Sequence, residues 1–211
     1  MSVKPLCATV IIVAGGKGVR MGGHVPKQYM ELRGRPVLWH TLQAFERADC
    51  ISGVIVVVAA DDMAYCQQAV LGGGDFSKVR SLVAGGSERA DSVRAGLGET
   101  KAEDTLILVH DAVRPFVSES LIERVVEAAD RWGAALPALP VADTIKRIRD
   151  EWVEDTPNRN LLRAAQTPQG FRRSLLCRAH EPREVDAATD DAMLVEMLGE
   201  PVRIVAGEAE N

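Results

Sequence analysis

The sequence predicts an α/β fold in which a mainly parallel sheet is covered by helices on both faces. Three observations support this prediction: runs of β-branched apolar residues recur along the chain, helical stretches separate them, and each run is apolar throughout. Continuously apolar strands are typical of parallel sheets buried on both faces. Ligands of such Rossmann-like sheets bind beyond the carboxyl ends of the strands.

The individual elements follow from these patterns. The expected strands are Ala8–Val13, Val54–Ala59, Val79–Val83, Leu106–His110 and, with weaker patterns, Ala134–Leu139 and Val202–Val205. The expected helices are Val37–Asp49, Asp62–Val70, Ala90–Leu97 and Ser118–Trp132. In the last of these, one face carries Leu121, Val125, Val126 and Ala129. We expect Ser120 and Glu123 to form a capping box at its start.

One segment breaks the alternation of strands and helices. Residues at about 143–160 mix β-branched, aromatic and charged side chains without a helical stripe. This pattern fits a two-stranded arm that projects from the sheet and an ordinary edge hairpin equally well. No internal repeat or low-complexity tract divides the chain. We therefore expect residues 1–211 to form a single domain that carries a β-arm.

Composition excludes several classes of protein. A net charge of −5 argues against a general nucleic-acid binder. No apolar run approaches the roughly 20 residues that a membrane span needs. The four cysteines are scattered and form no C-x-x-C motif, so we expect neither a zinc site nor disulfides. These features fit a protein of the reducing cytoplasm.

A glycine-rich loop, AGGKGVRMG, follows the first expected strand. It fails the dinucleotide fingerprint G-x-G-x-x-G, because Met21 takes the third glycine position after Gly16 and Gly18. That failure disfavours an NAD-dependent oxidoreductase. The loop also fails the P-loop pattern, because His24 follows Gly23 where lysine is required.

Two interpretations of the loop stay open from this stretch alone. In the first, its bare amides cradle a triphosphate while Arg20 and Lys27 reach the phosphate oxygens. In the second, the loop is a structural turn whose cations face solvent.

Further blocks narrow the choice. They are GGSERADSV (Gly85–Val93), VHDAVRPF (Val109–Phe116), ADTIKR (Ala142–Arg147), AAQTPQGF (Ala164–Phe171) and ATDDA (Ala188–Ala192). With the glycine loop, the chain resembles the family of 2-C-methyl-D-erythritol 4-phosphate cytidylyltransferases over nearly its whole length. Six blocks in register are far more specific than one glycine loop.

The resemblance implies transfer of CMP from CTP to methylerythritol phosphate, with release of pyrophosphate. The nucleophile is a phosphate oxygen that is already anionic, so positioning and cation placement should do most of the catalysis. The resemblance makes Arg20 and Lys27 the transition-state cations. It also implies a Mg²⁺ ion that bridges the triphosphate oxygens, with Asp111 near the ribose and the metal.

The resemblance also implies two sets of binding residues. The nucleotide set is Ala14, Gly15, Gly16, Gly18, Gly85, Gly86, Ser87, Ser92, Asp111 and Ala112. The set for the second substrate is Arg114, Thr144, Arg159, Thr167 and Thr189. In this family the arm crosses to a partner subunit, which implies a homodimer in which Arg159 holds the incoming phosphate.

The chain departs from the family pattern at several positions. Asp is common where Ser87 stands, and the family often has Asp and Trp in place of Asn158 and Arg163. The family also has a phosphate-binding lysine beyond the stretch that ends here at Asn211.

Two other functions compete with this interpretation. A CDP-ribitol pyrophosphorylase shares the fold and several of the blocks. A non-catalytic nucleotide-binding subunit is less favoured, because binding alone needs fewer converging cations than Arg20 and Lys27 provide.

Overall fold

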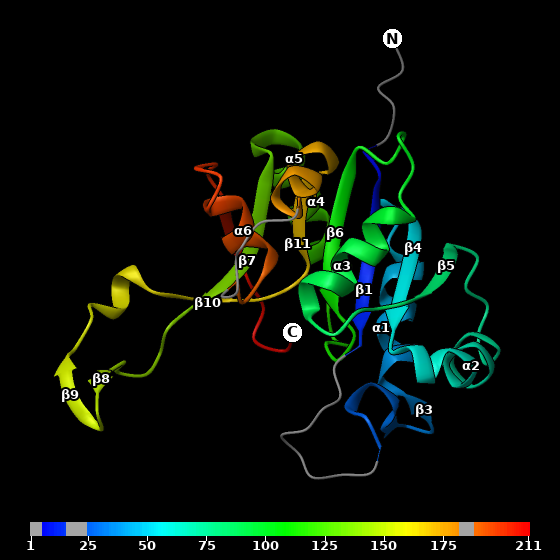
Figure 1. Ribbon diagram of the computed structural model, residues 1–211, viewed down its shortest axis with the longest axis horizontal. Coiled ribbons are helices and arrows are strands. Elements are labelled where there is room, and N and C mark those ends of the chain that lie inside the picture. Colours follow the sequence, from blue (N-terminus) through cyan, green and yellow to red (C-terminus); the bar gives the residue numbers. More distant parts are fainter. Residues whose placement is uncertain (1–5, 16–24, 182–187) are drawn as a thin grey trace.

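The computed structural model describes residues 6–15, 25–181 and 188–211. Within these residues, eight strands form one sheet in the order β10-β7-β11-β6-β1-β4-β5, and β12 pairs with β7 (Figure 1). The bounds are β1 Ala8–Ala14, β4 Ile51–Val58, β5 Val79–Ala84, β6 Leu106–Asp111, β7 Ala134–Pro140, β10 Arg163–Ala165, β11 Gln169–Arg172 and β12 Arg203–Ala206. The predicted α/β fold is confirmed.

The sheet is mostly parallel. Strand β1 pairs in parallel with β4 and β6, β4 pairs in parallel with β5, and β12 does so with β7. Strands β10 and β11 run antiparallel to β7, and β11 also runs antiparallel to β6. Apolar periodicity did not predict these two strands, because they are three and four residues long.

Helices cover both faces of the sheet, and the side chains of β1 show how. Val10 and Ile12 belong to a core with α1 (Val37–Arg47) and α4 (Glu119–Trp132). Ile11 belongs to a second core with α3 (Arg89–Gly98), α5 (Arg173–Ala179) and α6 (Asp191–Glu196). Successive strand residues point to opposite faces, so a strand between two helical layers must be apolar throughout.

The helix expected over Ser118–Trp132 is present, but its cap differs from the prediction. Leu121, Val125, Val126 and Ala129 are buried, as the periodicity predicts. The Ser118 hydroxyl, however, accepts the backbone N–H of Leu121 at 3.1 Å, and the helix begins at Glu119. Ser120 and Glu123 therefore lie inside the helix, so the predicted capping box is wrong. Serine is a favourable N-cap residue at either position, and the Ser118 hydroxyl also donates to Glu208 at 2.8 Å, a contact between distant parts of the chain.

The segment expected as the helix Asp62–Val70 is helical but irregular. It contains a 3-10 turn at Ala60–Asp62, the short α2 at Met63–Tyr65 and a π-helical stretch at Cys66–Leu71. Two small strands, β2 (Glu31–Leu32) and β3 (Arg35–Pro36), precede α1. Among the described residues, no helix is both long enough and apolar enough to cross a membrane.

The arm is a separate two-stranded sheet. It consists of β8 (Arg147–Arg149) and β9 (Trp152–Asp155), and it projects from the body beyond β7 and β10 (Figure 1). Asp150 and Glu151 form its two-residue turn, with φ of 48° and 70°. Positive φ at both positions is typical of tight hairpin turns. The structure thus selects the projecting arm over the edge hairpin.

Candidate active site

A pocket of about 700 Å³ lies beyond the carboxyl ends of the parallel strands. Its walls come from the ends of β1, β4, β5 and β6 and from the first turn of α3. Of the residues implied by the resemblance, the structure brings to this pocket Ala14, Gly15, Lys27, Gly85, Gly86, Ser87, Ser92, Asp111 and Ala112. Gly16, Gly18 and Arg20 lie outside the described residues.

The β5–α3 turn forms one wall of the pocket. A capping box joins Glu88 and Asp91 at the start of α3 and fixes the turn against that helix. A Cβ on Gly85 would lie 2.5 Å from the Ser92 hydroxyl, and one on Gly86 would lie 2.2 Å from Asp91 Cβ. A side chain at either position would therefore force the turn or its neighbours in α3 to shift, and both glycines line the pocket.

Lys27 enters the pocket from a 3-10 turn at Lys27–Tyr29. The next residue anchors this turn, because Gln28 is buried and its side-chain amide donates to the Ala14 carbonyl at 2.7 Å. Since Ala14 ends β1, this bond ties the turn that carries the lysine to an inner strand of the sheet. No local pattern in the sequence indicated a role for Gln28.

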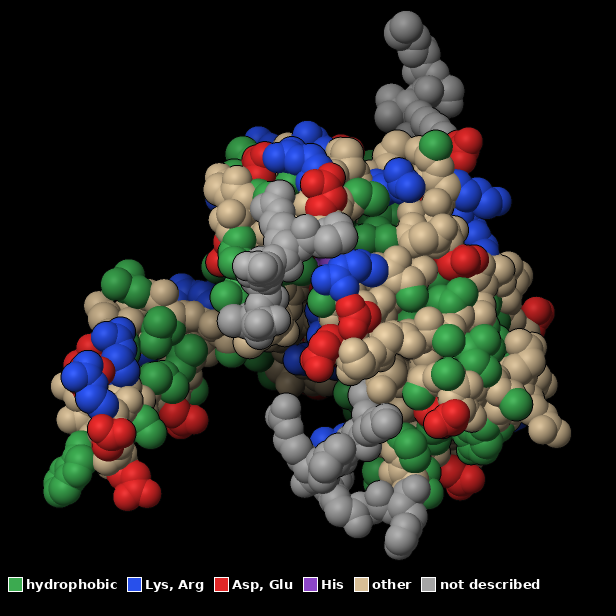
Figure 2. Space-filling model, in the orientation of Figure 1, with side chains coloured by type: hydrophobic (Ala, Val, Ile, Leu, Met, Phe, Trp, Pro, Cys, Tyr) green, Lys and Arg blue, Asp and Glu red, His purple; other side chains and the backbone are tan. Residues whose placement is uncertain are grey.

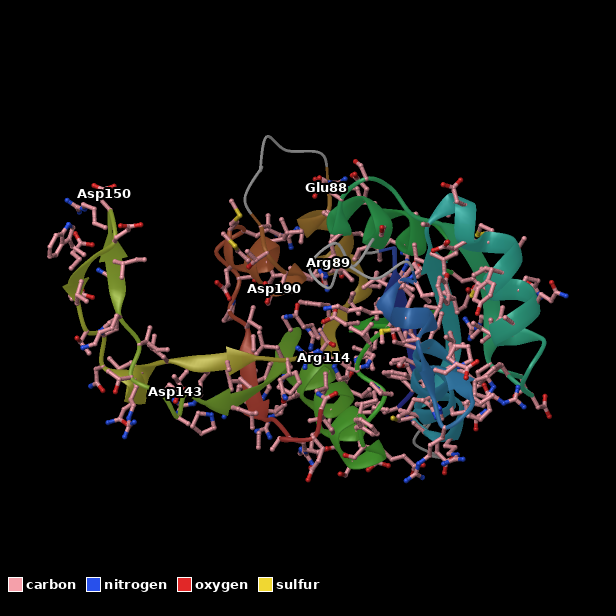
Figure 3. All side chains as sticks on the ribbon, turned by 90° about the horizontal axis from the view of Figure 1, so that it is seen from below. Glu88, Arg89, Arg114, Asp143, Asp150 and Asp190 are labelled. Carbon is pink, nitrogen blue, oxygen red and sulfur yellow. The ribbon has the colours of Figure 1, made fainter. Side chains whose placement is uncertain are left out.

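The acidic centre of the pocket is Asp111, at the end of β6, and two guanidinium groups flank it. Arg114 Nε lies 3.3 Å from Asp111 Oδ2, and Arg89 Nε lies 3.8 Å from Oδ1. Figure 3 shows Arg89 and Arg114 within the body of the molecule, near Asp190 at the start of α6. The two arginines place positive charge on both sides of the Asp111 carboxylate and compensate it.

Asp111 is also held from behind. Its backbone N–H donates to the Thr167 hydroxyl at 3.1 Å, and the same hydroxyl lies 3.1 Å from Nδ1 of buried His110. Burial lowers the pKa of His110 to about 4, so its imidazole is neutral at pH 7. Its Nε2 therefore donates to the Arg114 carbonyl at 3.1 Å, and Nδ1 accepts from Thr167. This chain of bonds fixes the loop that carries both Asp111 and Arg114.

The other residues assigned to the second substrate divide into two groups. Thr167 and Arg114 lie beside Asp111, and exposed Thr189 directly precedes Asp190, the N-cap of α6. Thr144 and Arg159 belong to the arm region, and Arg159 donates to the Ala142 carbonyl at 2.7 Å. Figure 3 shows Asp143 and Asp150 well away from Arg89 and Arg114. One chain alone does not bring the arm to its own pocket.

Three residues at and behind the pocket wall were not expected from the sequence. Arg89 lines the pocket and forms an ion pair with Asp191 at 2.6 Å, and His180 Nε2 lies 2.9 Å from the other Asp191 oxygen. Two of the sequence blocks, GGSERADSV and ATDDA, contain the arginine and the aspartate. Their pairing joins positions 102 residues apart, which no local pattern reveals.

The pocket can bind a magnesium ion only if oxygen atoms of a substrate supply some of its ligands. Among the described residues, no group of three or more His, Cys, Asp or Glu side chains is placed to hold a metal. Asp111 is about one-third exposed in the pocket and provides one carboxylate. Mg²⁺ is commonly bound by one or two carboxylates together with substrate phosphates and water, and a single Asp meets that requirement.

Comparison with known proteins gives a consistent result. The profile of the IspD family, described as 2-C-methyl-D-erythritol 4-phosphate cytidylyltransferase, matches residues 8–211. A protein of that name from Geobacter metallireducens is 46% identical over 206 residues, which cover 95% of this chain and 89% of the relative.

Two solved structures are also similar. The 4-diphosphocytidyl-2C-methyl-D-erythritol synthase from Anaerococcus prevotii has a TM-score of 0.85 at 34% identity, covering 97% of this chain and 88% of the other. The 2-C-methyl-D-erythritol 4-phosphate cytidylyltransferase from Thermus thermophilus has a TM-score of 0.75 at 37% identity, covering 97% and 90%.

Proposed function

Because the chain belongs to the 2-C-methyl-D-erythritol 4-phosphate cytidylyltransferase family, we propose that it transfers CMP from CTP to 2-C-methyl-D-erythritol 4-phosphate. The products are pyrophosphate and 4-diphosphocytidyl-2-C-methyl-D-erythritol. The observation that carries the proposal is one pocket of about 700 Å³ that gathers Gly15, Gly85 and Gly86 together with Lys27 and Asp111. A nucleoside triphosphate fits a cavity of this size and polarity.

The cytosine base is assigned to the wall formed by Gly85, Gly86 and Ser92. Backbone groups and a small hydroxyl match the edge of a pyrimidine, and we expect this wall to select a pyrimidine over a purine. Uracil presents a carbonyl where cytosine presents an amino donor. Binding uracil would leave acceptors on the wall unsatisfied, which is costly in a desolvated site.

The triphosphate is assigned to the other end of the pocket, near Gly15 and Lys27. Attack by one anion on another is opposed by their repulsion, and charge grows on the α-phosphoryl group and the leaving pyrophosphate. A lysine anchored by Gln28 can stabilise that charge without rearranging. Arg20 is assigned the same role from the sequence resemblance alone.

Asp111 would hold a Mg²⁺ ion together with the triphosphate oxygens. When bound, the ion would supply charge stabilisation to the phosphoryl groups. The described residues have two tasks here: Arg89 and Arg114 flank the Asp111 carboxylate, and Thr167 fixes its backbone.

The second substrate is assigned to the side of Asp111 that faces Arg114, Thr167 and Thr189. Its phosphate would be held by Arg159 from a partner subunit. The projecting position of the arm supports this assignment, as does the exposure of its apolar side chains, with Trp152 80% and Leu161 82% exposed. Figure 2 shows hydrophobic side chains among the charged ones on the arm. A two-fold partner would cover them, because an isolated two-stranded ribbon is marginally stable.

We place this activity in the cytoplasm. All four cysteines are free thiols, which is the usual state in a reducing compartment.

The experiment that tests the proposed function measures pyrophosphate release. Each of the four nucleoside triphosphates is combined with methylerythritol phosphate or with ribitol 5-phosphate. We expect turnover with CTP and methylerythritol phosphate, and little with UTP, ATP or GTP. Preference for ribitol 5-phosphate would favour the CDP-ribitol pyrophosphorylase instead. Comparable turnover with UTP would refute the cytosine assignment.

A further inference from the structure

A buried ion pair lies directly behind the pocket wall. Asp191, the first residue of α6, has a side chain that is 1% exposed and accepts from Arg89 Nη1 at 2.6 Å. Arg89 is the first residue of α3, and its side chain is 31% exposed because one side faces the pocket. The pair therefore connects the nucleotide pocket to a helix on the side of the second substrate.

His180 completes this arrangement. Its side chain is 2% exposed, and Nε2 lies 2.9 Å from Asp191 Oδ1. Burial alone would raise the pKa of Asp191, but the hydrogen bond from His180 and the charge of Arg89 outweigh it and hold that pKa below its usual value. Asp191 is therefore ionised, and each of its two oxygens has a partner of its own.

The position of Asp191 is itself fixed. Buried Gln169, on β11, donates to the N-cap Asp190 at 2.7 Å and accepts from the Ala192 backbone N–H at 3.0 Å. The Asp190 side chain in turn accepts from the Met193 backbone at 2.9 Å. These bonds hold the residues on both sides of Asp191, so its carboxylate points at Arg89 from a rigid support.

A support of this kind is more than a stable core requires. Burying a carboxylate carries a desolvation penalty, and an apolar pair of similar volume often gives equal stability. Asp191 leaves the Arg89 side chain poised between two carboxylates, 3.8 Å from Asp111. The geometry thus uses a buried charge to set the position of a cation in the pocket.

We propose that Arg89 is a further nucleotide-binding residue and that Asp191, supported by His180, is the positioning residue that holds it. Arg89 compensates Asp111 and directs its remaining donors into the pocket, where they meet the bound nucleotide. Asp191 acts only through Arg89. The inference rests on the proposed function, since it concerns the CTP pocket.

The test is a set of variants assayed for the KM of CTP, for kcat and for melting temperature. We expect Arg89→Ala and Asp191→Ala each to raise the KM for CTP about tenfold, as the loss of a hydrogen bond to a charged group does. Asp191→Asn should keep the KM within about threefold of wild type, because its amide oxygen can still accept from Arg89. In the Arg89→Ala background, Asp191→Ala should raise the KM no further.

If Asp191 acted only through its negative charge, its removal would change the KM for CTP in the opposite direction. Removing a carboxylate makes the pocket region more positive and would tighten the binding of a polyanion. An unchanged or lowered KM in Asp191→Ala therefore overturns the proposal, and so do additive effects in the double variant. Should Asp191→Ala fail to fold, Arg89→Met tests the same claim, because it leaves the buried Asp191–His180 pair in place. A wild-type KM in Arg89→Met overturns the proposal.

Arg178→Ala serves as the matched control. Arg178 lies on α5, its side chain is 55% exposed, and it is not among the residues that line the pocket. The substitution removes its ion pair with Glu200 at 3.3 Å. Its KM and kcat should equal those of the wild type. Wild-type protein that transfers no nucleotide overturns the proposed function and this inference together, whereas active wild type with a normal KM in Asp191→Ala overturns the inference alone.

Discussion

The Thr167 hydroxyl accepts a hydrogen bond from the Asp111 backbone N–H at 3.1 Å. This contact joins the segment just before the antiparallel strand β11 to the end of the parallel strand β6. Thr167 is buried, and its peptide bond to Pro168 is cis. Because the same hydroxyl donates to His110, the loop that carries Asp111 and Arg114 is fixed from behind before any substrate arrives.

Replacing Lys27 by alanine should lower kcat by about 10²–10³-fold, as the loss of one preorganised donor to a developing oxyanion does. The KM for CTP should change less, because the backbone of the glycine turns remains. Steady-state kinetics with Arg33→Ala as control checks this, since Arg33 lies in the exposed turn between β2 and β3 and does not line the pocket. A normal kcat with only KM raised would make Lys27 a plain binding residue.

Gly86→Ala should weaken CTP binding. The added methyl group would lie 2.2 Å from Asp91 Cβ, so the β5–α3 turn must shift at the wall assigned to the base. Gly98→Ala is the matched control, because nothing lies within 4 Å of a Cβ built there. We expect the KM for CTP to rise at least about fivefold in Gly86→Ala and to stay unchanged in Gly98→Ala, consistent with loss of at least one hydrogen bond. Equal values for the two variants would show that the turn does not contact the nucleotide.

Asp104 should stabilise the fold in a pH-dependent way. Its carboxylate accepts from the Lys101 backbone at 2.8 Å, from Thr9 at 2.7 Å and from Arg80 at 2.8 Å. Burial alone would raise the pKa of Asp104, but these three partners hold it below the ordinary value of 3.8. The stabilisation is therefore present above pH 3.8 and is lost as the pH falls through the lower pKa of the folded state.

Urea unfolding of Asp104→Asn at pH 7 and pH 3.5 tests this dependence. The variant should lower the free energy of unfolding by about 1–3 kcal/mol at pH 7, as the loss of hydrogen bonds to a charged group does. The difference from wild type should shrink at pH 3.5. A difference that is constant or grows on acidification would contradict the assignment.

Mixed dimers test the role of the arm. If Arg159 serves the pocket of the partner and Lys27 serves its own, then a dimer of Lys27→Ala with Arg159→Ala has one site that lacks both residues and one that lacks neither. Random pairing makes half of the dimers mixed, so activity should recover to roughly a quarter of wild type. If confirmed subunit exchange restores nothing, Arg159 acts within its own chain or not at all.

Most of the fold could be predicted from the sequence, because the continuous apolar run Val54–Val58 of β4 and the amphipathic α4 carry strong local patterns. Strands β10 and β11 could not, since they are short and are held by pairing with β7 and β6. Gly85 and Gly86 were expected from the family resemblance, and the structure brings both to the pocket. The pairing of Arg89 with Asp191 could not be predicted, because it depends on how α3 and α6 pack on the sheet.

The most direct measurement of the central claim follows a phosphorus label from CTP. With ³²P at the α-phosphate, methylerythritol phosphate and Mg²⁺, the label should appear in a cytidine diphosphate alcohol. With the label at the γ-phosphate, it should appear in pyrophosphate. When ribitol 5-phosphate competes at equal concentration, the α-label should still pass to methylerythritol phosphate. Label that stays in CTP, appears as free CMP, or passes to ribitol 5-phosphate would contradict the account.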